Sequence, residues 1–285
     1  MADINRTTTI TLPSDVASEI LQKSQDESAV MSLARQITLP GRGATVPVIT
    51  GDPEAAWVGE TAKKPVSNPE IGTKLLRPYK LAVIETFSAE FVRDAAALYD
   101  ALIARLPKAL AQKFDNTVIG GTAKPGSDFD NFAACTAQAM TAATAYTALV
   151  TAETDIAAHG GIVNGYAVSP QAKGMLLSAV DGNGRPLFIN SVAEGAIPVI
   201  LGSRTVQSKG LYAAGSPNKA GVVGDWTQAI YGTVNGVEIA ISDQATLGTG
   251  ESAINLWQQN MVAVRAEIEI GFRADTSCFN LLTIA

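Results

Sequence analysis

Histidine is almost absent from this sequence, because His159 is the only one among 285 residues. It lies just before Gly160-Gly161, a position typical of a helix end, where an imidazole usually has a structural role. Most Ser-His-Asp, Cys-His and zinc sites would need this one residue, and no nucleophile motif surrounds any serine. The sequence therefore predicts no firm catalytic residue, no metal site and no cofactor, and it does not indicate an enzyme.

Cysteine and long apolar runs are also scarce. Cys135 and Cys278 are far apart and have neither disulfide-framework nor metal-binding spacing, so we expect reduced, partly buried thiols. No apolar run reaches the ~18 residues of a membrane helix. The first residues, Met1–Arg6, lack the apolar core of a signal peptide. We therefore expect synthesis in the cytoplasm and no membrane partner.

Charge is sparse and mostly negative. Charged residues make up 17% of the chain, hydrophobic residues 47%, and the net charge is −6, a globular composition. An acidic chain gains nothing from counterion release on DNA, so sequence-specific nucleic-acid binding is not expected. The glycine-rich stretch Gly120–Ser127 fails the phosphate-loop spacing, and we interpret it as a connection.

Residues 40–80 are rich in proline and glycine. After Pro40 they hold five of the 13 prolines, so no helix can run through them. Strand-like pieces at Ala44–Ile49 and Lys74–Leu76 predict a long extended hairpin, which is marginal in water alone. A loop this long is usually functional. We expect its side chains to contact a neighbouring subunit, with folding back on its own domain as the alternative; the contact candidates are Trp57, Val58, Glu60, Ile71 and Leu75.

A long amphipathic helix is predicted over residues 88–119. A strand at Tyr79–Phe87 leads into it, Ser88 is a candidate cap, and apolar residues recur every three or four positions from Phe91 to Val118. Pro107 should kink or split this helix, and Gly120-Gly121 should end it.

The flanking parts of the chain predict mixed α+β structure. An N-terminal helical stripe covers residues 13–37, and Phe132–Ala157 is alanine-rich and predicted helical. Further expectations are a strand over Gly161–Val168, a helix beginning at Pro170, a strand over Ile197–Ile200, a hairpin turn at Asn235-Gly236, and a strand over Met261–Ile270 with alternating sides.

An ordered set of short motifs runs along nearly the whole chain from about residue 12. The motifs are Trp57–Glu60 before Lys64-Pro65, Leu75–Ile84, Ser88–Glu90 before Arg93-Asp94, Asn164–Pro170, Asp181–Phe188, Gly224–Trp226, Asn260-Met261 before Val264–Glu267, and Gly271-Phe272. In this order they resemble the major capsid proteins of tailed bacteriophages, whose fold is named after phage Hong Kong 97.

The resemblance implies an α+β Hong Kong 97-type capsid fold. Residues 1–39 would be an N-terminal arm and 40–80 the extended loop; 81–129 with 251–285 would form a peripheral domain around the long helix 88–119, and 130–250 an axial domain. The implied function is self-assembly into pentamers and hexamers of an icosahedral head around double-stranded DNA, located in the virion. Only about 40 residues precede the loop, so either a separate scaffold protein exists or the chain assembles without one. Portal and decoration proteins are further implied partners.

One chemical step is implied by the same resemblance. In the founding member a loop lysine of one subunit forms an isopeptide bond with an asparagine of a second, assisted by a glutamate of a third, and Lys64, Asn260 and Glu267 fall at the matching positions. An apolar site and a carboxylate base would help the amine lose its proton. The alternative stays open: Lys64 is a solvated charge, Asn260 satisfies backbone groups, and Glu267 pairs with Arg265 of a neighbour or another basic group.

Two other functions remain as alternatives. An encapsulin-like nanocompartment shell would share the fold but have a shorter loop and a cargo-binding N-terminal helix. A soluble α+β enzyme would need a site that a single histidine and no convergent motif argue against.

Overall fold

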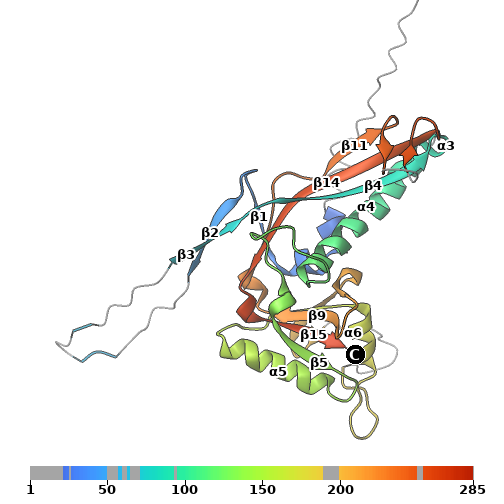
Figure 1. The fold of residues 1–285 in the computed structure, drawn as a ribbon. Coiled ribbons are helices and arrows are strands. Elements are labelled where there is room, and N and C mark those ends of the chain that lie inside the picture. The colour runs from blue at the N-terminus through green and yellow to red at the C-terminus, as the bar shows by residue number, and fades with distance from the viewer. Residues whose placement is uncertain are drawn as a thin grey trace, which may run out of the picture.

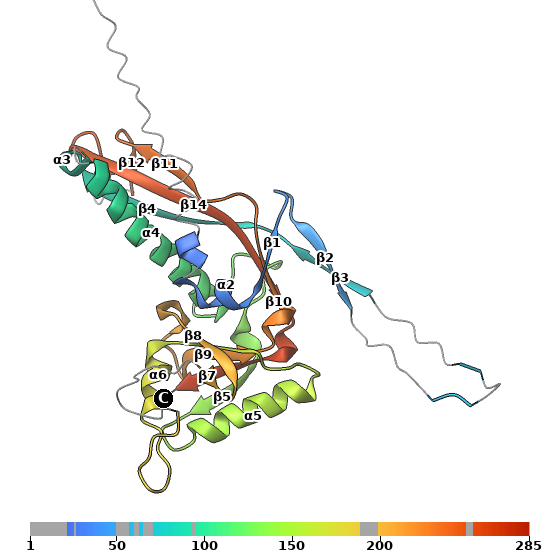
Figure 2. The same ribbon diagram turned by 180° about the vertical axis from the view of Figure 1, so that it is seen from behind.

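The structure is a computed structural model, and it describes residues 22–25, 27–49, 57–59, 63–64, 71–92, 95–188, 199–248 and 253–284. The fold is mixed α+β, with two main sheets and a separate hairpin (Figure 1). The first sheet is elongated and the second lies in a compact part of the molecule. The hairpin extends sideways from the body in both views (Figure 2).

The hairpin consists of β2 (Ala44–Ile49) and β3 (Ile71–Leu76). The two strands pair antiparallel in a register that joins Ala44 to Leu76 and Ile49 to Ile71. The hairpin predicted from the prolines and the strand-like pieces is therefore confirmed.

The first sheet is built around β14 (Met261–Ala274). One edge of β14 pairs with β4 (Tyr79–Ser88), and the other with β11 (Glu238–Ser242) and β10 (Ala229–Thr233) in succession. The outermost strand, β1 (Arg35–Thr38), runs parallel to β10. The alternation predicted for β14 is confirmed along its middle, since Val264, Ala266, Ile268 and Ile270 are buried while Arg265 is exposed.

Two helices follow β4 and return along the first sheet (Figure 1). They are α3 (Ala89–Val92) and α4 (Ala95–Val118), which cover most of the helix predicted over residues 88–119; residues 93 and 94 lie outside the described part of the chain. Pro107 lies inside α4 without splitting it, which corrects the split that proline suggested. A single proline removes one backbone hydrogen bond, and the burial of Leu106 and Leu110 on either side stabilises the helix across it.

The second sheet has six strands in the order β5-β15-β9-β6-β8-β7. Their bounds are β5 (Thr136–Met140), β15 (Phe279–Ile284), β9 (Asn218–Gly224), β6 (Gly165–Val168), β8 (Ser203–Gln207) and β7 (Val199–Ile200). Helices α5 (Ala145–Ala158) and α6 (Pro170–Leu177) pack on it, and α6 has the predicted Ser169 cap, whose Oγ accepts from the N–H of Ala172 at 3.2 Å. The short elements are η1 (Phe132–Ala134), η2 (Lys209–Leu211), η3 (Trp226–Gln228), β12 (Thr246–Leu247), β13 (Ile254–Asn255) and η5 (Thr276–Cys278).

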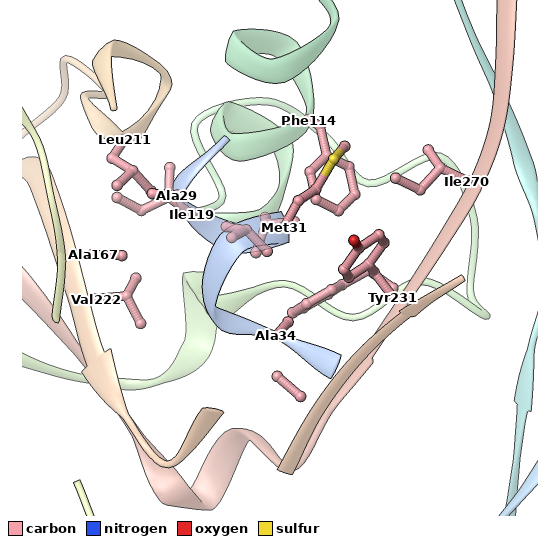
Figure 3. Packing of buried hydrophobic residues seen from close by; sticks show 14 of the residues in the cluster. Ala29, Met31, Ala34, Phe114, Ile119, Ala167, Leu211, Val222, Tyr231 and Ile270 are labelled. Carbon is pink, nitrogen blue, oxygen red and sulfur yellow. The ribbon is translucent and has the colours of Figure 1, made fainter. Parts of the chain in front are cut away.

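Helix α2 (Ala29–Leu33) lies at the junction of the two sheets. Figure 3 shows Met31 beside Phe114 of α4, with Tyr231 of β10 nearby and Leu211 on the other side of the helix. One buried cluster thus includes residues of both sheets, of α4 and of this N-terminal segment. The segment before the hairpin is therefore part of the core.

Three predictions about secondary structure are wrong. The first is the helix over Phe132–Ala157: residues 136–140 form β5, paired parallel with β15, and the helix begins only at Ala145. Alanine favours helix, but the open edge of β15 provides a partner that local propensity cannot reveal.

The second wrong prediction is the hairpin at Asn235-Gly236. Strands β10 and β11 do not pair with each other; both pair with β14, one after the other. The favoured two-residue turn needs positive φ at both positions, and neither Asn235 nor Gly236 has it. Asn235-Gly236 instead lies in an irregular connection between β10 and β11, which pair one after the other with the same edge of β14.

The third is the N-terminal helical stripe through Ile37. Residues 22–25, 27 and 29–33 are helical, but Arg35–Thr38 form β1 because they pair with the free edge of β10. Residues 13–21 of that prediction lie outside the described part of the chain.

Candidate functional site

The β2–β3 hairpin is attached to the body by a small root. Leu76 is fully buried there, while its neighbour Leu75 is 40% exposed. Beyond the root, Trp57 and Val58 are exposed, and the tryptophan has no measurable cover from its own chain. Burying a tryptophan stabilises an interface more than almost any other side chain, so this indicates a contact surface. The exposure of Trp57 favours contact with a neighbouring subunit over folding back on its own domain.

Two further contact candidates, Glu60 and Ile71, have no described side chain. Glu60 lies outside the described residues, and Ile71 is described only as backbone of β3. Neither side chain adds to the geometry.

The three residues with a possible crosslinking role lie on different parts of the chain. Lys64 is exposed and belongs to the segment beyond the hairpin strands. Asn260 ends the turn before β14, with φ of 52°, and its carbonyl accepts the N–H of Ala89 at 2.8 Å. The hairpin and α3 are at distant parts of the molecule in both views (Figures 1 and 2). One chain therefore does not bring Lys64 and Asn260 together.

Glu267 lies on β14 in a mostly acidic strip. Its Oε1 is 3.4 Å from Nε of Arg265, and across the strands it faces Glu238. Glu269 is 3.6 Å from Nζ of Lys80. Three carboxylates thus lie beside two basic side chains, Arg265 and Lys80, within the chain. In the noncovalent interpretation, Glu267 pairs with a basic group, and within this chain Arg265 is such a group.

The described residues show no arrangement typical of an enzyme site. A mainly apolar hollow of about 180 Å³ is lined by Tyr79, Leu81, Phe114 and Phe129, with Lys80 and Lys113 beside it. Within the described ranges, no group of three metal-binding side chains occurs and no helix is long and apolar enough to span a membrane.

The histidine and both thiols have structural surroundings. His159 is the C-cap of α5, and its Nδ1 is 2.8 Å from the carbonyl oxygen of Asp155. Burial raises the pKa of the Cys135 thiol to about 12 and also raises the pKa of Cys278. Neither cysteine has the lowered pKa that a nucleophilic thiol needs.

Sequence reasoning missed two features. Trp257 is 75% exposed in the turn before β14, directly before the polar stretch Gln258–Asn260, and that polarity was the available signal. Arg273 near the end of β14 contacts the hairpin root and two aspartates, and no local pattern marks it.

Comparison with known proteins gives consistent matches along the chain. A family model described as the phage capsid family matches residues 8–276. The probable major capsid protein of Mycobacterium phage D29 is 31% identical, over 95% of this chain and 89% of that protein. A solved structure from Gordonia phage Cozz has a TM-score of 0.70 at 23% identity, covering 91% of this chain and 87% of the other. Another, the capsid of a native GTA particle computed with C5 symmetry, has a TM-score of 0.63 at 17% identity, covering 100% and 96%.

Proposed function

This chain belongs to the phage capsid family, and we propose that it builds an icosahedral phage head from pentamers and hexamers of itself. Relatives at 31% identity are named as probable major capsid proteins, so the chain is a structural protein of the virion and not an enzyme. The five-fold symmetry named for one structural neighbour supports the pentamers. An encapsulin-like shell is the weaker alternative because the relatives are phage capsid proteins.

The single observation that carries this proposal is the exposed hairpin. Its strands protrude from the body, and the loop beyond them carries a tryptophan with no cover from its own chain. A two-stranded hairpin is marginal in water, so a surface on a second copy would stabilise both the hairpin and the indole.

The finer layout follows the Hong Kong 97 type. In this proposal residues 1–39 are the arm and 40–80 the extended loop; 81–129 and 251–285 form the peripheral domain, and 130–250 the axial domain. The junction position of α2 supports an arm that is tied to the body. Scaffold, portal and decoration proteins are further proposed partners, the enclosed DNA is bound without sequence specificity, and synthesis takes place in the host cytoplasm.

A sedimentation experiment with two matched tryptophan variants tests the proposal. Trp57→Ala should leave the unfolding transition of the chain unchanged and strongly reduce the fraction that sediments as capsomers or shells. Trp226→Ala, which removes a buried indole, should instead destabilise the fold itself. A wild-type chain that sediments only as a small oligomer would contradict the proposal.

We also propose that the contacts of Lys64 are noncovalent. The supporting observation is the Arg265–Glu267 pair, which engages the carboxylate that a crosslink would use as its base. In the competing reaction, neutral Nζ of Lys64 attacks Cγ of Asn260, Glu267 takes a proton from Nζ and passes it to the amide nitrogen of Asn260, the C–N bond to Nζ forms, and the old C–N bond breaks to release ammonia.

Boiling purified shells in detergent separates the two chemistries on a gel. A single band at the 29.6 kDa monomer mass supports noncovalent contacts. A ladder overturns this proposal, and a ladder lost in Lys64→Arg but kept in Lys63→Arg would assign the crosslink to Lys64.

A further inference from the structure

The root of the hairpin is a close contact between β3 and the end of β14. A Cβ atom added at Gly271 would lie 2.5 Å from the carbonyl oxygen of Arg77, so glycine allows the two backbones to approach. The side chain of Leu76 is fully buried in this root. Two polar contacts beside Leu76 add to the attachment of the hairpin to the body.

Arg273 of β14 makes the densest set of these polar contacts. Its Nε donates to the carbonyl oxygen of Leu75 at 2.8 Å. One terminal nitrogen donates to Oδ1 of Asp130 at 2.9 Å and the other to Oδ1 of Asp128 at 3.2 Å. Its side chain is only 14% exposed. One guanidinium therefore joins three segments: β3, β14 and the connection after α4.

The two aspartates give the guanidinium a fixed orientation. Asp130 is itself tied to β14, because its Oδ2 accepts the N–H of Ala274 at 3.2 Å and its own N–H donates to the carbonyl of Phe272 at 3.1 Å. A guanidinium is a planar fork, so carboxylates on both terminal nitrogens determine where Nε points. Here it points at a main-chain carbonyl of the hairpin.

A second hydrogen bond joins β3 and β14 beside the one from Arg273 to Leu75. Nζ of Lys74 donates to the carbonyl oxygen of Ala274 at 3.3 Å, so adjacent residues of β3 and of β14 bond each other in opposite directions. Such a crossed pair resists rotation of the hairpin about its root better than either bond alone.

We propose that Arg273, oriented by Asp128 and Asp130, is the positioning residue that sets the direction in which the β2–β3 hairpin leaves the body, and so how it meets a second copy of this chain. The meeting with a second copy rests on the proposed function. The orientation of the hairpin is a property of the single chain and can be measured separately.

Hydrogen exchange on the unassembled full-length chain tests the orientation. Arg273→Gln should make the amides of residues 71–76 exchange about tenfold faster, because losing a charged hydrogen bond of this kind shifts a local opening equilibrium by roughly that factor. Amides shared by β4 and β14 should keep their rates. Arg265→Gln, on the exposed part of the same strand, is the matched control and should change neither region.

Two further variants keep the test independent of folding. Asp128→Asn keeps an oxygen acceptor for one terminal nitrogen but removes its negative charge, and should accelerate the same amides by a smaller factor. Arg273→Lys keeps the charge but not the fork, and should fall between wild type and Arg273→Gln. Unchanged exchange in residues 71–76, or equally faster exchange throughout β14, would overturn the proposal.

Electron microscopy then measures the consequence for assembly. Arg273→Gln should give shells of mixed diameter or open sheets under conditions where wild type gives uniform shells. Uniform shells from both would overturn the assembly role of Arg273. If wild type forms no shells, the proposed function fails, while the exchange difference still decides whether Arg273 holds the hairpin.

Discussion

The hydroxyl of Ser28 donates to the carboxylate of Asp115 at 2.6 Å, a buried bond between residues 87 positions apart. The same carboxylate accepts the N–H groups of Ala29 and Val30 at 3.1 and 3.3 Å, while Oγ of Ser28 accepts the N–H of Met31. A side chain of α4 thus caps the first turn of α2 from outside the helix. This contact ties the N-terminal segment to the body.

Asp115 gives a pH dependence of stability. Burial raises the pKa of its carboxyl from 3.8 to about 6, outweighing the hydrogen bonds from Ser208, Ser28, Ala29 and Val30, which lower it. Because the folded-state pKa is the higher one, the stabilising contribution is full below the unfolded pKa and is lost as the pH rises through about 6.

The measurement is urea unfolding of wild type and Asp115→Asn across this range. The unfolding free energy of wild type minus that of the variant should fall as the pH rises from about 4 to about 7. A constant difference would show that burial does not shift this carboxyl.

The end of α4 at Gly120 requires glycine. Its φ is 79°, its N–H donates to Thr117, and the N–H of Gly121 reaches back to Asn116 at 2.8 Å, which is a Schellman end. An added Cβ would lie 2.5 Å from Cβ of Ala133. Gly120→Ala should therefore lower the unfolding free energy by about 1–3 kcal/mol in urea titrations.

The control for that substitution is Gly182→Ala. A Cβ at Gly182 meets nothing within 4 Å, so this variant should stay within about 0.5 kcal/mol of wild type. Equal effects of the two substitutions would contradict the account of the helix end.

The aromatic cluster at the junction of the sheets centres on Phe132. Its ring lies 4.6 Å from that of Phe279, 5.7 Å from Phe272 and 6.0 Å from Trp226, between ring centroids. Phe132→Ala should cost about 3–5 kcal/mol of unfolding free energy, since the site is fully buried. Tyr146→Ala on the exposed face of α5 is the comparison, and a similar loss in both would refute the central role of the cluster.

The cysteines should react slowly in the folded chain. Burial raises the pKa of Cys135 and of Cys278, so little thiolate is present near neutral pH. A thiol reagent at about pH 8 should modify both much faster after denaturation than before. Rapid modification of the native chain would place a thiolate at the surface.

Features with local causes could be predicted from the sequence, and features with distant partners could not. The prolines of residues 40–80 exclude a helix wherever they lie, so the hairpin followed from them. The helix end at Gly120 and the Ser169 cap are equally local. By contrast, β5 exists because β15 lies beside it, and β10 and β11 run along β14 although Asn-Gly favours a turn between them.

The candidate site divides in the same way. Exposed apolar residues in the loop, Trp57 and Val58 above all, followed from its composition. Arg273 could not be found, because its role depends on Asp128 and Asp130, more than 140 positions earlier in the chain.

Cryo-electron microscopy of the purified full-length chain tests the central claim most directly. The account predicts closed icosahedral particles in which each β2–β3 hairpin lies on a neighbouring subunit and the indole of Trp57 is buried there. Particles that are only small oligomers, or shells in which the hairpin contacts its own subunit alone, would contradict it.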